Sequence, residues 1–540
     1  MRLNRVMIAA PKSGSGKTTI TCGLLWALKE RGLNPVSFKC GPDYIDPMFH
    51  KTVLDISSKN LDTFFTDEET TVNLMLDGRN DGDFAVLEGV MGLYDGLGGI
   101  REEGSSYHLA KITKTPVILA VDAKGMGRSV IALIAGFLSH DTDKLIKGVI
   151  LNRTSKSFYE TIAPLIKEEL GIKTLGYVPD NPECKLESRH LGLTLPGEVS
   201  GIREKLAAIS RVLADTVSVD EIMSIAMMES GDLPVKPSFC KVTGHAATTA
   251  TAPALAVIAI ARDQAFCFYY DDNLKLLEKY GAIIKYFSPI CDKKLPDNTS
   301  AILIGGGYPE MFLKELSENK PMRGEIRNAY KKGMPVIAEC GGFMYLHDSI
   351  SDKDGNEYKM AGIIPGGCVY KNKSVRFGYI ELSPKGKNTW TKDIKLRGHE
   401  FHYYDCDENG DDFTAVKPVT GRQYPCIINR DNLFAGFPHL YYPSDERIAE
   451  TIVKRHRNME NSYKFFQNNE CKYFPCHKGL KDFNCLFCYC PMYRLEKCPG
   501  NPSYIEKNGK KIKVCTNCTF PHDPDNYEKI MEILKRENDT

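Results

Sequence analysis

The sequence lacks long apolar runs. Its first apolar segment covers only residues 6–10, and a later one covers residues 254–261. A membrane-spanning helix needs about 20 apolar residues, and the apolar part of a signal peptide needs about 7 to 15. We therefore expect neither a signal peptide nor a membrane span, and we expect a cytoplasmic protein.

Blocks of like charge are also missing. The 70 Lys and Arg residues nearly balance the 69 Asp and Glu residues, and the basic residues do not gather in a cluster. A nucleic-acid-binding domain usually shows a basic patch or stripe. Nucleic acid is therefore not an expected partner, and a length of 540 residues predicts several domains.

Cysteine is unevenly distributed. Ten of the 18 cysteines are scattered through the first 470 residues, and eight lie between Cys471 and Cys518. Scattered cysteines indicate reduced cytoplasmic thiols, so the terminal group predicts metal ligands rather than disulfides.

A cysteine follows a buried apolar strand at residues 335–339. Cys340 is followed by Gly341 and Gly342, and then by a helix-like segment. Such a sharp strand-to-helix turn exposes a nucleophile beside backbone N–H groups that stabilise an oxyanion. A second glycine turn ending at Gly307 predicts the other oxyanion donor, beside that of Gly341, and His439 is the expected base. The alternative is a buried structural cysteine at a strand end.

These segments resemble the class I glutamine amidotransferase domain, in which a Cys–His pair hydrolyses glutamine and releases ammonia. Most such domains carry a glutamate two residues after the histidine, where this sequence has Tyr441. The resemblance therefore implies a Cys340–His439 dyad and a slow glutaminase unless a partner site is loaded.

The N-terminal segment predicts a phosphate-binding loop. A short apolar strand leads into a loop and then a helix, with the predicted ATP-binding residues Gly14, Ser15, Gly16, Lys17, Thr18 and Thr19. Backbone N–H groups of such a loop bind phosphates, the lysine reaches the terminal phosphates, and Thr18 offers a hydroxyl to Mg²⁺. Pro11 stands where the first glycine is usual, so the loop is a variant.

Four acids follow predicted strands of the same region. Asp43 and Asp46 lie in a Gly-Pro-Asp loop, Glu88 ends a buried strand, and Asp95 lies in a glycine-rich loop. A strand-ending acid is where P-loop folds keep the carboxylate that orients Mg²⁺. A solvated turn would also explain Asp43 and Asp46.

The segments G-P-D-Y-I-D-P at residues 41–47 and E-G-V-M-G-L-Y-D-G at residues 88–96 resemble the cobyrinate a,c-diamide synthase family. The resemblance implies ATP-dependent amidation of two acetate side chains of a corrin ring, with these four acids near the phosphate and the acceptor. It also implies that Arg189 and His190 face the anionic corrinoid; on its own this segment would be a surface loop. Asn152, at a strand end, is a candidate for binding adenine, and a loop asparagine is the alternative.

Strands and helices alternate in both large regions, which predicts parallel sheets covered by helices on both faces. We therefore expect two doubly wound α/β domains followed by a small cysteine-rich metal-binding domain. The predicted boundaries are 1–228 for the P-loop-like domain, 229–253 for a linker, 254–458 for the amidotransferase domain and 459–540 for the small domain.

The terminal segment has too few apolar runs to fold on a core alone, which favours metal as its organising element. The predicted ligands are Cys471, Cys476, Cys485, Cys488, Cys490, Cys498, Cys515 and Cys518. One or two tetrahedral Zn²⁺ sites are the simplest interpretation, and an iron–sulfur cluster is the alternative. The expected role of this terminal segment is docking or metal sensing.

The resulting hypothesis is amidation of the a and c acetates of cobyrinate through acyl phosphates, in cobalamin biosynthesis. Cobyrinate, MgATP and L-glutamine are the expected partners, with a homodimer or docking to other corrinoid-pathway enzymes as further possibilities. Three alternatives stay open: another tetrapyrrole such as nickel sirohydrochlorin, a P-loop switch with an inactive amidotransferase domain, and a cobalt carrier or sensor centred on the tail. For His399 and His402 the sequence favours a role in the amidotransferase scaffold or at the domain contact, and no chemistry is assigned to them.

Overall fold

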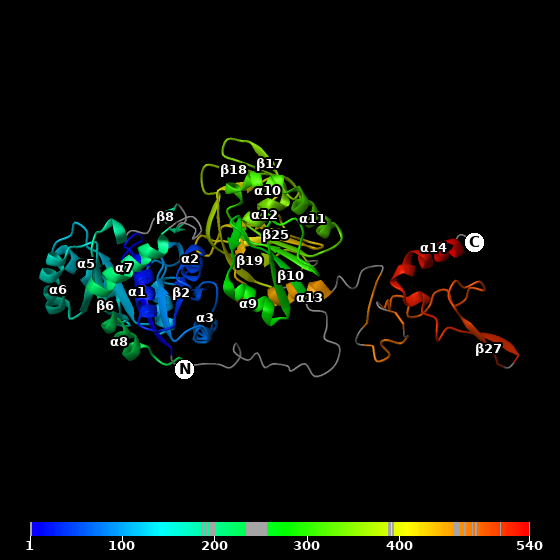
Figure 1. Cartoon of the computed structure of the whole chain (residues 1–540), viewed down its shortest axis with the longest axis horizontal. Coiled ribbons are helices and arrows are strands. Elements are labelled where there is room, and N and C mark those ends of the chain that lie inside the picture. Colours follow the sequence, from blue (N-terminus) through cyan, green and yellow to red (C-terminus); the bar gives the residue numbers. More distant parts are fainter. Residues whose placement is uncertain are drawn as a thin grey trace.

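The computed structural model contains two α/β parts that lie against each other and a smaller third part set apart from them (Figure 1). The structure describes residues 3–184, 188–189, 192–193, 201–233, 256–386, 390, 394–457, 465–468, 471–477, 479–480, 483–507 and 509–538. Most of the predicted linker therefore lies outside the described residues.

The first part is built on a parallel sheet of seven strands in the order β3-β2-β4-β1-β5-β6-β7. Its strands are β1 (Asn4–Ala9), β2 (Pro35–Cys40), β3 (Ser58–Leu61), β4 (Phe84–Glu88), β5 (Val117–Asp122), β6 (Ile146–Asn152) and β7 (Lys173–Val178). The central strands are almost wholly buried because helices cover both faces. The strand order reverses beside β1, and ligands of such sheets bind at the carboxyl ends of the strands at this switch point.

Two apolar cores lie on the two faces of this sheet. The helices are α1 (Lys17–Glu30), α2 (Ile45–Val53), α3 (Glu68–Asp77), α4 (Ser106–Ile112), α5 (Ser129–His140), α6 (Lys156–Leu170), α7 (Ile202–Thr216) and α8 (Val219–Glu229). Leu24 of α1 and Ile209 of α7 belong to one core, while Leu109 of α4 and Ile131 of α5 belong to the other. The predicted doubly wound sheet is confirmed.

The second part has a six-stranded sheet in the order β12-β10-β13-β15-β25-β24, parallel except for β24. Its strands are β10 (Ala256–Ala261), β12 (Ala282–Phe287), β13 (Ala301–Ile304), β15 (Val336–Glu339), β24 (Ile428–Arg430) and β25 (Leu433–Gly436). The helices of this part are α9 (Asp271–Lys279), α10 (Leu313–Glu318), α11 (Lys320–Lys331), α12 (Gly341–Leu346) and α13 (Arg447–Arg457).

Smaller sheets extend this part, and the sequence did not predict them; their strands pair antiparallel except for β16 and β18, which are parallel. One has the order β23-β22-β19-β20-β26, a second has the order β17-β16-β18-β21, and β11 pairs with β14. Their strands are β11 (Phe266–Phe268), β14 (Gly306–Gly307), β16 (His347–Ser351), β17 (Glu357–Lys359), β18 (Ile364–Tyr370), β19 (Arg376–Pro384), β20 (Leu396–His402), β21 (Tyr404–Cys406), β22 (Phe413–Val416), β23 (Gln423–Cys426) and β26 (His439–Leu440). The first of these sheets carries His439 into the site.

Strands β18 and β21 hold a disulfide between Cys368 and Cys406. The two residues are direct partners in the antiparallel register, which brings their side chains together. The prediction that the scattered cysteines are reduced is therefore wrong for this pair. Cys340 and the other scattered cysteines that the structure describes carry free thiols.

Polar and aromatic contacts join the two large parts. The Tyr379 hydroxyl donates to Asp62 at 2.7 Å, and Arg397 donates to the carbonyl oxygen of Phe64 at 2.6 Å. The Lys51 ammonium lies 2.7 Å from the Asp271 carboxylate. Tyr270 and Tyr441 of the second part belong to an apolar core of the first, so the interface is packed.

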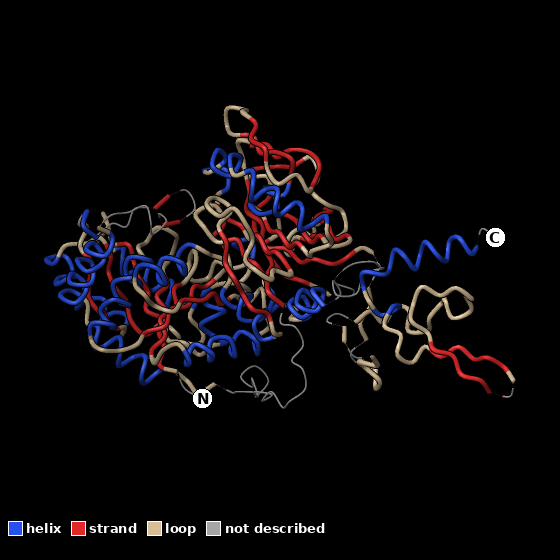
Figure 2. The backbone as a smooth tube through the Cα atoms, turned by 45° about the vertical axis from the view of Figure 1, so that its right-hand side comes forward, coloured by secondary structure: helices blue, strands red, loops and turns tan. Residues whose placement is uncertain are grey.

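The third part consists mainly of loops (Figure 2), with one hairpin of β27 (Ser503–Lys507) and β28 (Lys510–Val514) and a final helix α14 (Tyr527–Asn538). Few of its apolar side chains are buried, among them Phe483, Met492 and Ile530. Across the described ranges of the whole chain, the structure contains no helix long and apolar enough to cross a membrane.

Candidate active sites

The loop between β1 and α1 has the backbone of a phosphate-binding loop. Gly14 and Gly16 both have positive φ angles, 75° and 91°, which favour glycine. The Lys17 ammonium donates to the carbonyl oxygens of Met91 at 2.5 Å and Lys12 at 3.3 Å. Burial, together with the charge of Lys39, lowers the pKa of Lys17 to about 8. The loop therefore holds its lysine at the switch point of the sheet.

A buried lysine that the sequence analysis missed stands at the centre of the predicted acids. The Lys39 ammonium, at the end of β2, lies 2.5 Å from Asp46, 2.8 Å from Glu88 and 4.0 Å from Asp43. Burial alone would lower the pKa of Lys39, but the carboxylates of Asp46 and Glu88 outweigh burial and raise it well above its usual value. The sequence signal that could have identified Lys39 is a lysine at the end of a buried strand, shortly before two acids.

The pKa values of Asp43 and Asp46 shift in opposite directions. Burial and the neighbouring Asp46 carboxylate raise the pKa of Asp43 to about 7. Burial acts in the same direction on Asp46, but the Lys39 ammonium outweighs it and lowers the pKa of Asp46. Asp43 accepts hydrogen bonds from the backbone N–H groups of Ile45 and Asp46, which fixes the loop.

Oxygen atoms suited to Mg²⁺ lie beside the loop. The Thr18 hydroxyl donates to Glu88 Oε1 at 2.6 Å, so the predicted Mg²⁺ ligand and the strand-ending acid are adjacent. Glu88 Oε2 is buried and has no hydrogen-bond partner among the described residues. A hydroxyl and an unpartnered carboxylate oxygen fit a hard cation that prefers oxygen ligands.

Asn152 packs against the phosphate-binding loop. Its side-chain amide donates to the carbonyl oxygen of Ser15 at 2.8 Å, and its Oδ1 accepts from the N–H of Arg153. A side-chain carbon at Gly16 would clash with this amide, so a glycine is required there. In this structure the side chain of Asn152 holds the phosphate-binding loop through its hydrogen bond to Ser15, and its binding of adenine stays a prediction.

The other predicted ATP-side residues take different positions. Asp95 Oδ2 accepts from the N–H of Gly92 at 2.9 Å, and its charge acts on Lys17. Arg189 lies in the two-residue strand β8 (Ser188–Arg189), which pairs with β9 (Gly192–Leu193). His190 lies outside the described residues, so the predicted contact with the corrinoid stays a prediction.

Cys340 forms the expected sharp turn between β15 and α12. Its φ and ψ angles are 48° and −106°, a conformation that non-glycine residues rarely adopt. Such strain at a strand-to-helix turn is typical of a nucleophile elbow. Burial, followed by the charge of Glu310, raises the pKa of the Cys340 thiol, against the hydrogen bond from the N–H of Gly341.

The two predicted oxyanion donors lie together. A side-chain carbon at Gly341 would stand 3.3 Å from the backbone nitrogen of Gly307. The N–H of Gly342 donates to the carbonyl oxygen of Gly305, which ties the elbow to the glycine turn. The glycine turn and the elbow therefore lie side by side, and the role of their N–H groups as an oxyanion hole stays a prediction.

His439 reaches the same glycine turn from β26. A side-chain carbon at Gly306 would stand 3.2 Å from His439 Nδ1, which has no hydrogen-bond partner among the described residues. Tyr441, in the place of the usual glutamate, instead donates its hydroxyl to Asp272 at 2.8 Å. Burial and the charge of His402 lower the pKa of His439 to about 3.

His399, to which the sequence assigned no chemistry, is the cross-strand partner of His439. Their rings stack with centroids 4.9 Å apart. The Tyr270 hydroxyl lies 3.3 Å from His399 Nδ1. His402 is different, because its ring stacks on Phe437 with centroids 3.8 Å apart.

Tyr44 joins the two sites, and the sequence analysis did not single it out. It lies between Asp43 and Asp46 on the ATP side, yet its ring centroid is 5.3 Å from that of His439 and 5.0 Å from that of Phe268. A small cavity beside it is lined by Tyr44, Phe268, Tyr269, Tyr270, Asn273, Leu274, Leu303, Gly305, Glu339 and Tyr442. One loop therefore contacts both candidate active sites.

Comparison with known families matches three segments of the chain. Residues 6–193 match the CobQ/CobB/MinD/ParA nucleotide binding domain, residues 257–447 match the CobB/CobQ-like glutamine amidotransferase domain, and residues 462–540 match a cysteine-rich small domain. The chain is also 38% identical over 443 residues to the cobyrinate a,c-diamide synthase of Caldanaerobacter subterraneus, covering 80% of this chain and 94% of that protein.

The chain belongs to the cobyrinate a,c-diamide synthase family. The relatives of that name from Fusobacterium nucleatum and Listeria innocua are 38% and 39% identical, each across 83% of this chain and across 99% and 98% of their own lengths. Membership in this family and the amidotransferase domain identify a glutamine-hydrolysing ligase with a nucleotide-binding P-loop domain.

Proposed function

We propose that this chain converts the a and c acetate carboxylates of cobyrinate into amides, using ATP and the amide nitrogen of glutamine. One observation carries the proposal. The loop at residues 41–47 places Asp43 and Asp46 around Lys39 in the ATP-side site and packs Tyr44 against His439 in the glutamine-side site. A ligase that passes ammonia between two reactions needs such a connection, and the relatives' name supplies the substrate.

The ATP-side residues are arranged for phosphoryl transfer. A substrate carboxylate oxygen attacks the γ-phosphorus of ATP, ADP leaves, and an acyl phosphate forms. Lys17 and the backbone of the loop hold the phosphates in line for this attack. Thr18 and Glu88 would hold Mg²⁺, which neutralises phosphate charge when it is bound.

Lys39 would exchange partners during this step. In this structure its ammonium is neutralised by Asp46 and Glu88. Incoming phosphate oxygens compete for the same ammonium, which would release carboxylate oxygens toward the cation. The buried ion cluster therefore keeps the charges that the reaction needs in place before the substrates bind.

The glutamine-side residues are arranged for acyl transfer. The Cys340 sulfur attacks the side-chain carbonyl carbon of glutamine, and the N–H groups of Gly307 and Gly341 stabilise the oxyanion. His439 accepts the thiol proton and gives it to the leaving ammonia. Water then hydrolyses the thioester to glutamate, with the same histidine as base.

Ammonia must then reach the acyl phosphate, where it attacks the carbonyl carbon and displaces phosphate. An open path would lose ammonia to protonation in water. The small cavity between Glu339, Gly305 and Tyr44 supports an enclosed route, because it lies between the elbow and the acid-bearing loop.

The deciding experiment is mass spectrometry of products after incubation of the chain with MgATP, glutamine and either cobyrinate or nickel sirohydrochlorin. Two replacements of hydroxyl by amino on cobyrinate are expected. Modification of the nickel ring alone would keep the chemistry and change the substrate. Turnover of neither ring, with ATP still bound, would refute the proposal and favour a switch protein.

A further inference from the structure

The cysteine-rich segment at residues 465–538 carries thiols and imidazoles that the proposed amidation does not use. All eight predicted cysteine ligands lie in its described residues. Soft thiol and imidazole donors are the ligands that Zn²⁺ prefers in structural sites, and such sites organise small domains with little apolar core. The chemistry of the donor set therefore fits a metal.

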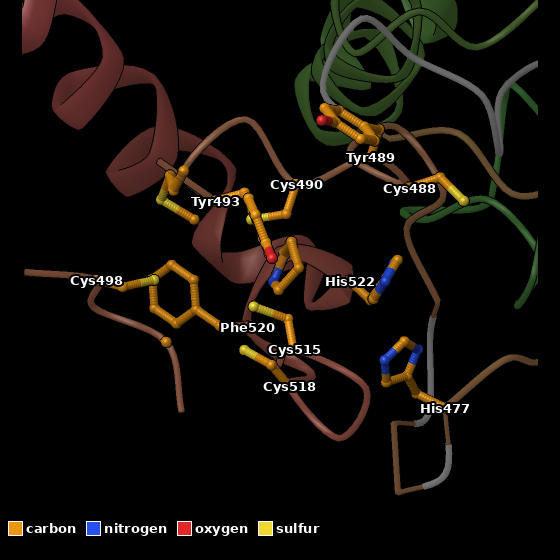
Figure 3. Close-up of a pocket in the computed structure, with 13 residues that line it drawn as sticks. His477, Cys488, Tyr489, Cys490, Tyr493, Cys498, Cys515, Cys518, Phe520 and His522 are labelled. Carbon is orange, nitrogen blue, oxygen red and sulfur yellow. The ribbon is translucent and has the colours of Figure 1, made fainter. Parts of the chain in front are cut away.

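Five thiols and two imidazoles line one cavity, and they fall into two groups. Figure 3 shows Cys490, Cys498, Cys515 and Cys518 on one side of the cavity and Cys488, His477 and His522 on the other. A side-chain carbon at Gly500 would stand 2.7 Å from Cys518 Sγ and 3.7 Å from Cys498 Sγ, so these two sulfurs face the same small gap. Cys490 lies near enough to the other three thiols of its group for their charges to act on it.

Backbone N–H groups point at sulfurs of this group. The N–H of Asn501 donates to Cys518 Sγ at 3.3 Å, and the N–H of Met492 donates to the sulfur of Cys490. N–H donors stabilise thiolates and commonly surround metal-bound sulfur.

A second group contains histidines. One donor atom each from Cys476, His477 and His522 lies within 4.8 Å of the other two. His522 is 4% exposed, and its Nδ1 lies 2.9 Å from the carbonyl oxygen of Asn484, to which it donates. This hydrogen bond leaves Nε2 with a lone pair, which is the usual arrangement of a metal-binding histidine.

The ring nitrogens of His477 are a second observation that indicates a bound metal. Both of its ring nitrogens are buried and lack a hydrogen-bond partner among the described residues. Its ring lies 4.6 Å from that of His522, and Figure 3 shows the two imidazoles as neighbours. A buried polar atom without a partner is unfavourable, so an imidazole placed in this way calls for a bound group.

We propose that this segment binds two metal ions at separate sites of different chemistry. One is an all-thiolate site of Cys490, Cys498, Cys515 and Cys518. The other is a mixed site of Cys476, His477 and His522, completed by a thiolate from the neighbouring Cys471, Cys485 or Cys488. Zn²⁺ suits both, because it accepts tetrahedral sulfur and nitrogen ligands.

The test measures the metal content of the purified full chain and the visible spectrum of its Co²⁺-substituted form. Two ions per chain are expected. A Cys515→Ser/Cys518→Ser variant should lose the all-thiolate ion alone, and a His477→Ala/His522→Ala variant should lose the mixed-site ion alone. Cys291→Ser, which changes an exposed thiol elsewhere, is the matched control.

A variant that replaces one proposed metal-binding residue by another keeps the test valid if the alanine and serine variants fail to fold. His522→Cys should keep both ions, while the Co²⁺ bands of the mixed site move to longer wavelength as sulfur replaces nitrogen. An unchanged Co²⁺ spectrum, or two ions retained by the double histidine variant, would overturn the assignment of the histidines. Iron with acid-labile sulfide in the purified chain would overturn both sites as proposed.

Discussion

The two candidate active sites of the large parts differ in how they carry buried charge. Around Lys39, an ammonium and several carboxylates are buried together and neutralise one another. Around Cys340, burial instead holds groups in their uncharged forms, since the pKa of the thiol is raised and that of His439 is lowered to about 3. One site is charged and compensated, and the other is close to neutral.

This difference in buried charge matches the different reaction expected at each site. The ATP-side site must accept polyanions and a cation, so compensated charges that can change partners suit it. The glutamine-side site needs a thiolate and an imidazolium, which this structure disfavours. A slow basal glutaminase is therefore expected, and its activation requires a change near Cys340 or His439. Tyr44 is placed to transmit that change from the acid-bearing loop.

The largest expected effect comes from removing the nucleophile. Cys340→Ala should lower glutamine-dependent amidation by about a thousandfold or more, because no other group forms the thioester. Amidation from added ammonium chloride should continue, because the ATP-side site is separate. Product formation is followed by mass spectrometry with each nitrogen source, with Cys291→Ala as the control. Equal loss with both sources would contradict the two-site comparison.

A substitution in the charged ATP-side site should give the opposite result, with ATP turnover reduced and glutamine hydrolysis retained. Glu88→Gln should lower ADP formation by about a hundredfold to a thousandfold, because a carboxylate beside Thr18 is lost. Basal glutaminase should persist, and Asp95→Asn should show the same pattern. Coupled ADP and glutamate assays measure both reactions, and Glu102→Gln at an exposed position is the control. Unchanged coupled turnover in both variants would remove these acids from the site.

Tyr44 tests whether the two sites communicate. Tyr44→Ala should lower glutamine-dependent amidation by up to about a hundredfold, because the ring that packs on His439 and lines the cavity is lost. Amidation from ammonia should change little, and more glutamate should form per ADP. Tyr44→Phe keeps the ring and should behave like the unaltered chain. If Tyr44→Ala leaves the glutamate to ADP ratio unchanged, the loop does not couple the sites.

The smallest effect concerns the pH dependence of ATP binding. Lys17 has a pKa of about 8 here, and bound phosphate would raise it. Below that pH the lysine is already charged; above it, binding must take up a proton, so affinity should fall by up to about tenfold per pH unit. Calorimetry in buffers of different ionisation enthalpy measures this uptake. In Lys17→Arg the guanidinium stays charged, so a remaining slope there would assign the effect to another group.

The sequence by itself determined the local parts of this protein. The strand, loop and helix that hold Lys17, and the strand and turn that hold Cys340, are each written in a short continuous stretch, because glycine and apolar patterning act over neighbouring residues. Alternating strands and helices predicted both parallel sheets. Tyr441, in the place of the usual glutamate, predicted a Cys340–His439 dyad, which stays a prediction; the structure shows that the Tyr441 hydroxyl donates to Asp272.

Only the tertiary structure decided which distant residues meet. Strand order and register decide four such contacts. They are the ion pairs of Lys39 with the acids, the hydrogen bond of Asn152 to Ser15, the packing of Tyr44 on His439, and the disulfide of Cys368 with Cys406. In the small third part, the division of eight cysteines and two histidines into two proposed metal-binding groups likewise depends on how its loops fold. Such contacts join positions far apart in the chain, and their energies come from packing and burial, which local sequence does not encode.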